Sequence, residues 1–310
     1  MTAKLDVIGL GMNVLDILVR VKEMPTWEHL GHPSRIVVDG GGLAATAVVA
    51  AQKLGLRTGF IGTHGNDQMG WIKNQLLAKY GVDLSHAVEM NVPENQICVV
   101  YVREDDGERF FSNHPSFWDH YLAPEQLDKA YITSADWLHL DGYHFDAARQ
   151  AARWMREAGK RVMYDGGRIH EKHIHQDQRE ILPDVDVLIS GSGFLEAITG
   201  EQELESAGRK ALELGPSIVV QTEGSDGSYT FTKQAYFHQP AMLVDAVDTT
   251  GAGDIFHGAY LYALQHRWNL QDSARFATAA SALSCFQVGG RNSIPSLKEI
   301  ETFLAQQVYR

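Results

Sequence analysis

Four short apolar segments in the second half of the chain restrict the fold more than any other feature. They cover residues 137–140, 161–165, 186–190 and 217–221, and a helix is expected at 147–157, between the first two. Strands with nearly continuous apolar sequence are buried on both faces, which is typical of a parallel sheet covered by helices. The sequence therefore predicts an α/β fold with a mostly parallel central sheet and helices on both of its faces.

The first part of the chain adds two more strands and a separate group of β-type segments. Strands are expected at residues 7–11 and 57–62, whereas residues 17–21, 35–38, 97–102 and 109–112 lie outside the alternation of strands and helices. An Asp-Gly pair at Asp106-Gly107 separates the last two segments and is a strong hairpin signal. Because no internal repeat or low-complexity linker occurs, we expect a single domain over residues 1–310, with inserted segments at about 14–39 and 95–115.

Composition and charge argue against several classes of protein. The net charge of −12 disfavours a nucleic-acid partner, which requires a basic face. No segment approaches the ~20 consecutive apolar residues of a membrane span, and the first residues lack the apolar core of a signal peptide. The two cysteines, Cys98 and Cys285, are expected to be buried free thiols in a reducing compartment. We therefore expect a cytoplasmic protein.

The motif that points to chemistry is Asp-Thr-Thr-Gly-Ala-Gly-Asp at residues 248–254, followed by apolar residues at helical spacing over 255–266. Gly251, Ala252 and Gly253 have small side chains, so a ligand can approach their backbone closely. Free N–H groups and the positive dipole end make such a helix start an anion site. Asp254 falls in the first helical turn. It is either a helix-start carboxylate favoured by the dipole or a base beside a bound phosphate.

This motif resembles the C-terminal signature of the ribokinase (PfkB) family of sugar and nucleoside kinases, and the likeness extends over the whole chain. The resemblance implies a ribokinase-like three-layer fold in which the inserted strands form a small β lid. It also implies an ATP-dependent kinase that phosphorylates a primary hydroxyl of a small sugar. In that family the Gly251–Gly253 segment is the anion hole for the transferred phosphoryl group, and Asp254 is the base that activates the sugar hydroxyl.

Further site residues follow from the same resemblance. The expected sugar contacts are Asp16, Gly41, Gly42, Thr46, Asn113 and Asp254. Outside that family Asp16 would be read as a solvated loop acid, and Thr46 stands where ribokinases usually carry Asn. Asp67, in a Gly-x-Asp-x-x-Gly turn, is expected to cap a helix.

The nucleotide side of the site is also implied by resemblance. The expected ATP contacts are Thr222, Gly224, Gly227, Gly251 and Gly253, and a K⁺ ion would contact Asp248, Thr250 and Ser293. Arg291 lies in the loop that covers adenine in this family, and the alternative is that Arg291 is only a surface cation.

Three departures from the family pattern affect the expected cofactor and substrate. Gly191 and Phe194 replace the Asn and Glu of the family's Asn-x-x-Glu motif, so Mg²⁺ is expected to be held mostly by ATP and water. Several segments, including Gly-Gly-Arg at 289–291, are similar to the sulfofructose-kinase-like subgroup. Tyr143, however, occupies the place of that subgroup's sulfonate-binding Arg, so a ketohexose or a related furanose is expected instead. The histidines at 170, 173 and 175 lack consistent metal-ligand spacing, which favours a solvated loop.

Two alternatives to a sugar kinase remain open. A nucleoside kinase on the same fold would need an aromatic seat for the base, which Phe110, Phe117 and Trp118 could supply, and a non-catalytic sensor would bind sugar without phosphorylating it. A dinucleotide enzyme is disfavoured because Val14 replaces the third glycine of the fingerprint, and no P-loop sequence occurs.

The resemblance further implies a homodimer that pairs through the lid.

Overall fold

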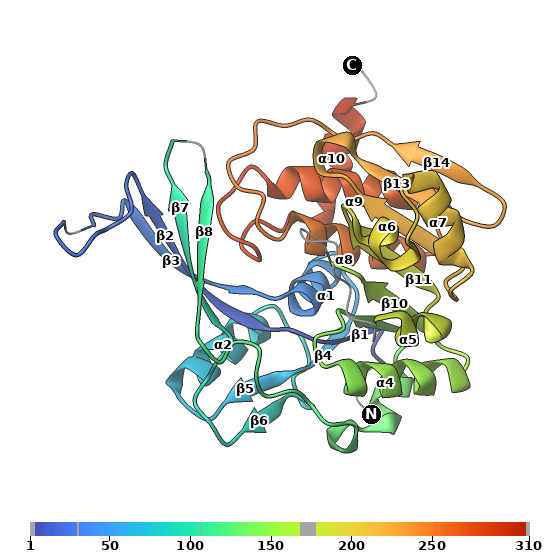
Figure 1. Cartoon of the computed structure of the whole chain (residues 1–310), viewed down its shortest axis with the longest axis horizontal. Coiled ribbons are helices and arrows are strands. Elements are labelled where there is room, and N and C mark those ends of the chain that lie inside the picture. Colours follow the sequence, from blue (N-terminus) through green and yellow to red (C-terminus); the bar gives the residue numbers. More distant parts are fainter. Residues whose placement is uncertain (1–3, 30, 106, 168–177, 308–310) are drawn as a thin grey trace.

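A central eight-stranded sheet organises the molecule, described by a computed structural model for residues 4–29, 31–105, 107–167 and 178–307. Six strands are parallel, and β13 and β14 extend the sheet in antiparallel fashion (Figure 1). The order is β14 (Tyr236–Gln239), β13 (Ser228–Phe231), β12 (Ile218–Thr222), β11 (Val187–Gly191), β10 (Arg161–Asp165), β9 (Trp137–Leu140), β1 (Val7–Leu10) and β4 (Thr58–Ile61). The predicted mostly parallel sheet is confirmed.

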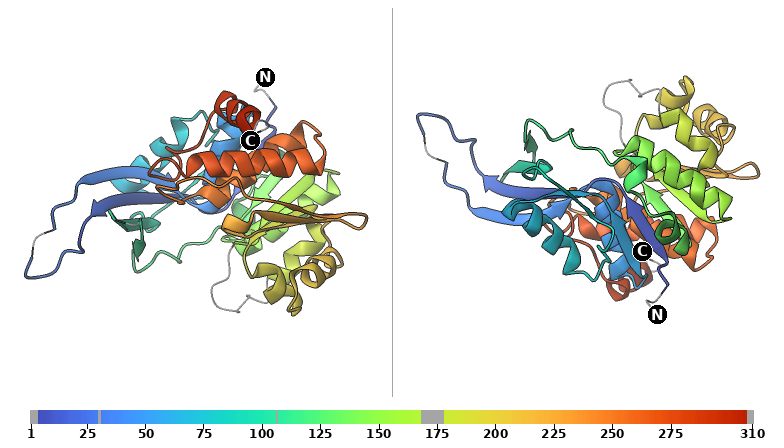
Figure 2. Two further views of the ribbon diagram at one scale, coloured as in Figure 1. Left: turned by 90° about the horizontal axis from the view of Figure 1, so that it is seen from above. Right: turned by 90° about the horizontal axis from the view of Figure 1, so that it is seen from below.

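Helices cover both faces of this sheet and bury a separate apolar core on each face (Figures 1 and 2). One face carries α1 (Leu43–Lys53), α2 (Gln68–Ala78), α8 (Ala252–Gln265), α9 (Leu270–Ser284) and α10 (Leu297–Gln307). The other carries α3 (Lys129–Ser134), α4 (Phe145–Glu157), α5 (Gln178–Ile181), α6 (Phe194–Thr199) and α7 (Leu204–Leu212). There are two cores because successive side chains of a strand point to opposite faces of the sheet. In β1, Val7 lies in the first core and Ile8 in the second.

Small residues bring α1 and α8 together over the sheet. A Cβ added at Gly258 would collide with the carbonyl oxygen of Ala47, so only glycine permits this approach. The start of α2 is fixed by Asp67, whose Oδ1 accepts a hydrogen bond from the amide of Gly70 at 2.9 Å, and this confirms the predicted cap. None of the helices in the described part of the chain combines the length and apolarity needed to cross a bilayer.

The four β-type segments outside the alternation form a second sheet that stands out from one end of the body (Figures 1 and 2). Its order is β3 (Arg35–Gly41), β2 (Val14–Val21), β7 (Ile97–Arg103) and β8 (Arg109–Asn113), while β5 (Thr63–Gly65) and β6 (Val88–Met90) pair separately. Leu18, Val100 and Val102 are buried in the sheet's own small core. Ile36 and Val38 are exposed. This sheet is the small β element that the resemblance implies.

Candidate active site

The candidate site lies where the carboxyl ends of the central strands face the start of α8 and the base of the four-stranded sheet. Asp141 follows β9, Asp165 ends β10 and Thr222 ends β12. In open parallel sheets this edge is where ligands bind, because loops and helix N-termini converge there.

The Gly251–Gly253 turn has the backbone geometry of an anion site. Gly251 caps α8 in the left-handed conformation, with φ of 74°, which glycine adopts at little cost. A Cβ added at Gly253 would meet nothing within 4 Å, so this residue borders open space. The first-turn amides of α8 lack partners within the helix, and the dipole adds positive charge at the same point.

Asp254 is the third residue of α8, and its side chain is partly exposed. Removal from water raises the pKa of Asp254 well above its ordinary value, and the nearby carboxyls of Asp165 and Asp141 raise it further. Arg291 opposes this shift. Asp254 is therefore placed as the sequence predicts, in a strongly acidic environment that the sequence did not reveal.

Two of the expected sugar-binding residues, Asp16 and Asn113, lie along one row of the four-stranded sheet. Strand pairing aligns Asp39 with Asp16, Asp16 with Cys98, and Cys98 with Asn113. Paired residues on neighbouring strands share a face. Asp16 and the exposed Asn113 therefore lie on the same face, two strands apart.

Glycines and α1 complete this part of the site. A Cβ at Gly41 would collide with Oδ2 of Asp16, and Gly42 begins α1 with φ of 93°. Thr46 follows one turn later, but its hydroxyl is buried and has no hydrogen-bond partner among the described residues. Asp141, which sequence reasoning missed, accepts hydrogen bonds from the amides of Met12 and Ala44 at 2.7 and 3.2 Å. It thereby fixes the start of α1 beside the site.

Arg291 is fully buried, so the alternative of a surface cation is wrong. Its Nη2 donates hydrogen bonds to Asn13 Oδ1 at 2.8 Å and to the carbonyl of Gly41. Burial lowers the pKa of Arg291 to about 10, while Asp39 and Asp16 oppose that shift. The guanidinium therefore lies beneath the row of expected sugar contacts.

The expected nucleotide residues share one cavity of about 310 Å³. Thr222, Gly224, Gly227 and Gly253 all line it, together with Ala252, whereas Gly251 does not. Apolar side chains of Met242, Leu243, Val244 and Phe256 complete the wall. A cavity with an apolar wall at one end and a helix N-terminus at the other suits a ligand that has a flat apolar part and an anionic part.

The three residues expected to bind K⁺ are already engaged with protein groups. Asp248 accepts hydrogen bonds from the amide and hydroxyl of Thr250 and from the amide of Gly289, and Ser293 donates to the carbonyl of Gly290. Arg109, at the start of β8, donates to the hydroxyls of Thr250 and Thr249 at 2.6 and 3.0 Å. Its guanidinium lies 3.8 Å from Asp248, so the four-stranded sheet brings a cation to the 248–254 motif.

The segment that replaces the Asn-x-x-Glu motif supplies no ready magnesium ligand. Gly191 ends β11, Phe194 is buried at the start of α6, and Glu196 accepts a hydrogen bond from Gln221 Nε2 at 3.1 Å. The hydroxyl of Tyr143 donates to the carbonyls of Phe117 and Asp119. The histidines at 170, 173 and 175 lie outside the described residues.

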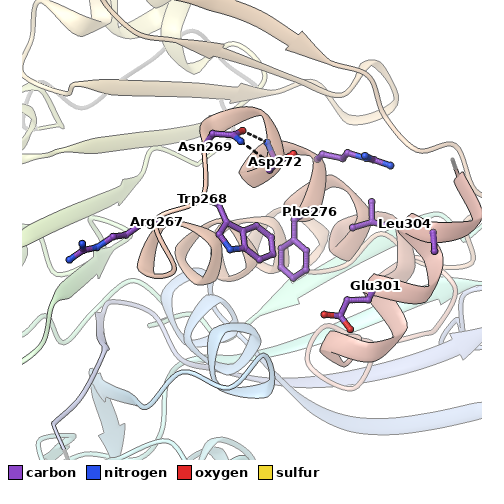
Figure 3. A pocket seen from close by; sticks show the side chains of 9 residues that line it. Arg267, Trp268, Asn269, Asp272, Phe276, Glu301 and Leu304 are labelled. Carbon is purple, nitrogen blue, oxygen red and sulfur yellow. Dashed lines mark hydrogen bonds between the residues drawn. The ribbon is translucent and has the colours of Figure 1, made fainter.

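A larger hollow of about 650 Å³ lies between the start of α9 and α10, and it is not the site (Figure 3). Trp268 and Phe276 pack edge to face there, with ring centroids 5.1 Å apart. The amide of Asp272 donates a hydrogen bond to Asn269 Oδ1, which caps α9, and Asn269 Nδ2 donates to the Asp272 carboxylate. These two polar side chains thus serve the local fold.

Comparison with known proteins identifies the class. The model of the pfkB family of carbohydrate kinases matches residues 2–297. An ATP-dependent ribose-1-phosphate kinase from Halopiger xanaduensis is 30% identical over 292 residues, covering 94% of this chain and 95% of that protein. The chain belongs to the pfkB family, and it is an ATP-dependent carbohydrate kinase.

Solved structures agree with this assignment. Ribokinase from Thermotoga maritima superimposes with a TM-score of 0.83 at 27% identity, covering 97% of this chain and 99% of that one. Ribokinase from Arabidopsis thaliana, solved with ribose and ATP, gives a TM-score of 0.80 at 25% identity, with the same coverage. The ribokinase-like fold is therefore confirmed, whereas the sulfofructose-kinase-like subgroup stays a prediction.

Proposed function

We propose that this kinase transfers the γ-phosphoryl group of ATP to a primary hydroxyl of a ketohexose or a related furanose, with Asp254 as the base. The observation that carries the proposal is the position of Asp254 on α8. Ala252 and Gly253 line the nucleotide cavity, and the carboxyl of Asp254 interacts electrostatically with Asp16 and Arg291 on the sugar side. A base must lie within hydrogen-bond reach of the attacking hydroxyl and close to the phosphoryl donor, and the place of Asp254 between the nucleotide cavity and the sugar side supports this role.

The other groups take roles that match their chemistry. Asp16, Gly41, Gly42, Thr46 and Asn113 would bind the sugar, and Thr222, Gly224 and Gly227 would bind ATP. The amides at Gly251–Gly253 would stabilise charge on the transferred phosphoryl. Mg²⁺ would accompany ATP, held mainly by phosphate oxygens and water, which is its usual coordination. K⁺ near Asp248, Thr250 and Ser293 stays a prediction, because Arg109 already supplies a positive charge there.

The four-stranded sheet would serve as the lid and as a dimer contact. Its hairpin reaches the phosphoryl end of the site through Arg109 and Thr250, which supports closure over the sugar. Exposed Ile36 and Val38, both on β3, support pairing with a second copy of the chain. The buried free thiols of Cys98 and Cys285 support work in the reducing cytoplasm.

The test is the substitution Asp254→Asn, which keeps shape but removes the proton acceptor. General-base catalysis contributes about 10²–10⁴-fold, so kcat should fall by at least about 100-fold. Sugar affinity, measured by calorimetry, should change only a few-fold because an amide still bonds the hydroxyl. A folded variant with a near-normal kcat would remove Asp254 as the base.

A nucleoside substrate is the second candidate. One relative, from Salmonella typhimurium, is an aminoimidazole riboside kinase, 29% identical over 290 residues. Trp118 is exposed, and its ring centroid lies 6.0 Å from that of Tyr143, so an aromatic surface is available to a base. Coupled ADP-release assays over sugars and nucleosides distinguish the two, since a nucleoside kinase would give its highest kcat/KM with a nucleoside.

A further inference from the structure

Three side chains that the proposed reaction does not use meet in the interior between the sheet and α8. They are His139 on β9, Asp165 at the end of β10 and His257 on α8, and all three are buried. One ligand atom from each lies within 4.8 Å of the other two. The closest pair is His257 Nδ1 and Asp165 Oδ2, which are 3.7 Å apart.

Three of the four ring nitrogens in this cluster lack a hydrogen-bond partner within the described part of the protein. Neither ring nitrogen of His139 has a hydrogen-bond partner there, nor does Nδ1 of His257. Oδ1 of Asp165 accepts a hydrogen bond from the amide of Gly167 at 2.7 Å, which fixes the carboxyl group and leaves Oδ2 toward His257. Buried polar groups are normally paired, so three unpaired nitrogens beside one carboxylate oxygen indicate a common ligand.

The surrounding charge identifies that ligand as a cation. The carboxyl groups of Asp141 and Asp254 interact electrostatically with Asp165, so the cluster lies in an acidic region of the protein. The donor groups are two imidazole rings and one carboxyl group, all buried. Neutral imidazole and carboxylate are the forms that bind metal ions.

We propose that His139, Asp165 and His257 bind a divalent transition-metal ion, for which Zn²⁺ is the best match. Two imidazoles and one carboxylate are a common zinc donor set, whereas Mg²⁺ prefers oxygen ligands alone. Zinc bonds of about 2.0–2.2 Å place tetrahedral ligand atoms about 3.4 Å apart. The ligand atoms here lie within 4.8 Å of one another, so small side-chain movements would bring them to that spacing. The remaining coordination position is left for water. The argument for this site does not depend on which sugar is phosphorylated.

The experiment measures metal content and stability rather than activity. Tag-free full-length protein is stripped with a chelator, dialysed with Zn²⁺ in the absence of nucleotide, and analysed by mass spectrometry of the metal. We expect one zinc ion per chain and a higher melting temperature than in the stripped protein. Loading with Co²⁺ should give the strong visible absorption of a four-coordinate site.

Matched variants locate the ion. His139→Gln and His257→Gln should each weaken zinc affinity by at least about 100-fold, because removal of even outer-shell partners costs 10–100-fold. His144→Gln is the control, since His144 is also a buried histidine with a pKa lowered to about 3 but lies outside the cluster. A second control replaces His170, His173 and His175 with Ala, and it should keep the zinc.

Three results would overturn the site. They are substoichiometric zinc in the stripped and reloaded wild type, equal zinc affinity in His139→Gln, and loss of zinc in the triple control. If the buried variants do not fold, the Co²⁺ spectrum of the wild type still decides, because the weak absorption of octahedral Co²⁺ would contradict the donor set.

Discussion

Replacement of the buried guanidinium by Arg291→Met should shift the pH dependence of sugar binding. Burial raises the pKa of Asp16 to about 7, Arg291 opposes that rise, and Asp39 adds to it. Without Arg291 the pKa of Asp16 should rise further, because burial and Asp39 then act unopposed. The ionised carboxylate, which is the form proposed to accept a hydrogen bond from the sugar, would then form only at higher pH.

The size of the expected pKa shift follows from the typical effect of a nearby charge on a carboxyl group. A nearby opposite charge shifts a carboxyl pKa by about 1–3 units. With a shift of only about one unit, the ionised fraction of Asp16 at neutral pH falls from about one half to about one tenth. Sugar affinity at neutral pH should therefore fall about five-fold from this cause alone. Removal of one partner from a buried pair of opposite charges also lowers the free energy of unfolding by about 3–5 kcal/mol. Circular dichroism must therefore first establish that the variant is folded.

The assay is calorimetric sugar titration between about pH 5 and pH 9. Both proteins carry Asp254→Asn, because Asp254 also titrates and Arg291 also acts on it. The affinity midpoint should lie at least about one unit higher with Arg291→Met than without it. Arg291→Lys should keep the original midpoint, and Asp16→Asn should remove the pH dependence. An unchanged midpoint in the folded Arg291→Met protein would refute the reasoning and leave Arg291 a purely structural role.

Three further predictions concern the cation site and the four-stranded sheet. Potassium should raise kcat relative to a bulky organic cation, and equal rates in both would contradict the K⁺ site. Arg109→Ala removes charged hydrogen bonds to Thr249 and Thr250, so kcat/KM for ATP should fall about 10- to 100-fold and the response to K⁺ should increase. Light scattering should give a dimer, and Ile36→Lys with Val38→Lys should give a folded monomer, because charge on this exposed face opposes pairing. A monomeric wild type would contradict the dimer.

The sequence predicted those features that depend on neighbours along the chain. Apolar strands, the Asp67 cap and the helix after Gly251 all follow from local pattern, and each is found. The same locality explains why the 248–254 motif could be read from the sequence. Consecutive residues form the turn, the start of the helix and the position of Asp254. Their relative placement therefore depends little on the rest of the fold.

The missed residues act through contacts between distant parts of the chain. Arg291 bonds to Asn13, 278 residues away, and no local pattern distinguishes this arginine from a surface cation. Arg109 meets Thr250 only because the four-stranded sheet leans toward α8, and Asp141 bonds to Met12 only because β9 and β1 are neighbouring strands. His139 sits inside an apolar strand, where its partners depend on the order of the strands. Sequence spacing cannot supply these pairings.

The buried guanidinium of Arg291 interacts with both Asp254 and Asp16. The acidic surroundings of Asp254 make it a stronger proton acceptor once ionised, because its neighbours favour the protonated form. That benefit has a cost, since the same neighbours reduce the ionised fraction, and Arg291 opposes them both at Asp254 and at Asp16. The loop that carries Arg291 is held to Asp39 through the amides of Arg291 and Asn292. The Gly289 amide of the same loop bonds to Asp248. Arg291, which opposes the pKa rise of the proposed base and of the proposed sugar contact, is therefore held in a loop that is bonded to the 248–254 motif, so a displacement of this loop should disturb all three proposed functions together.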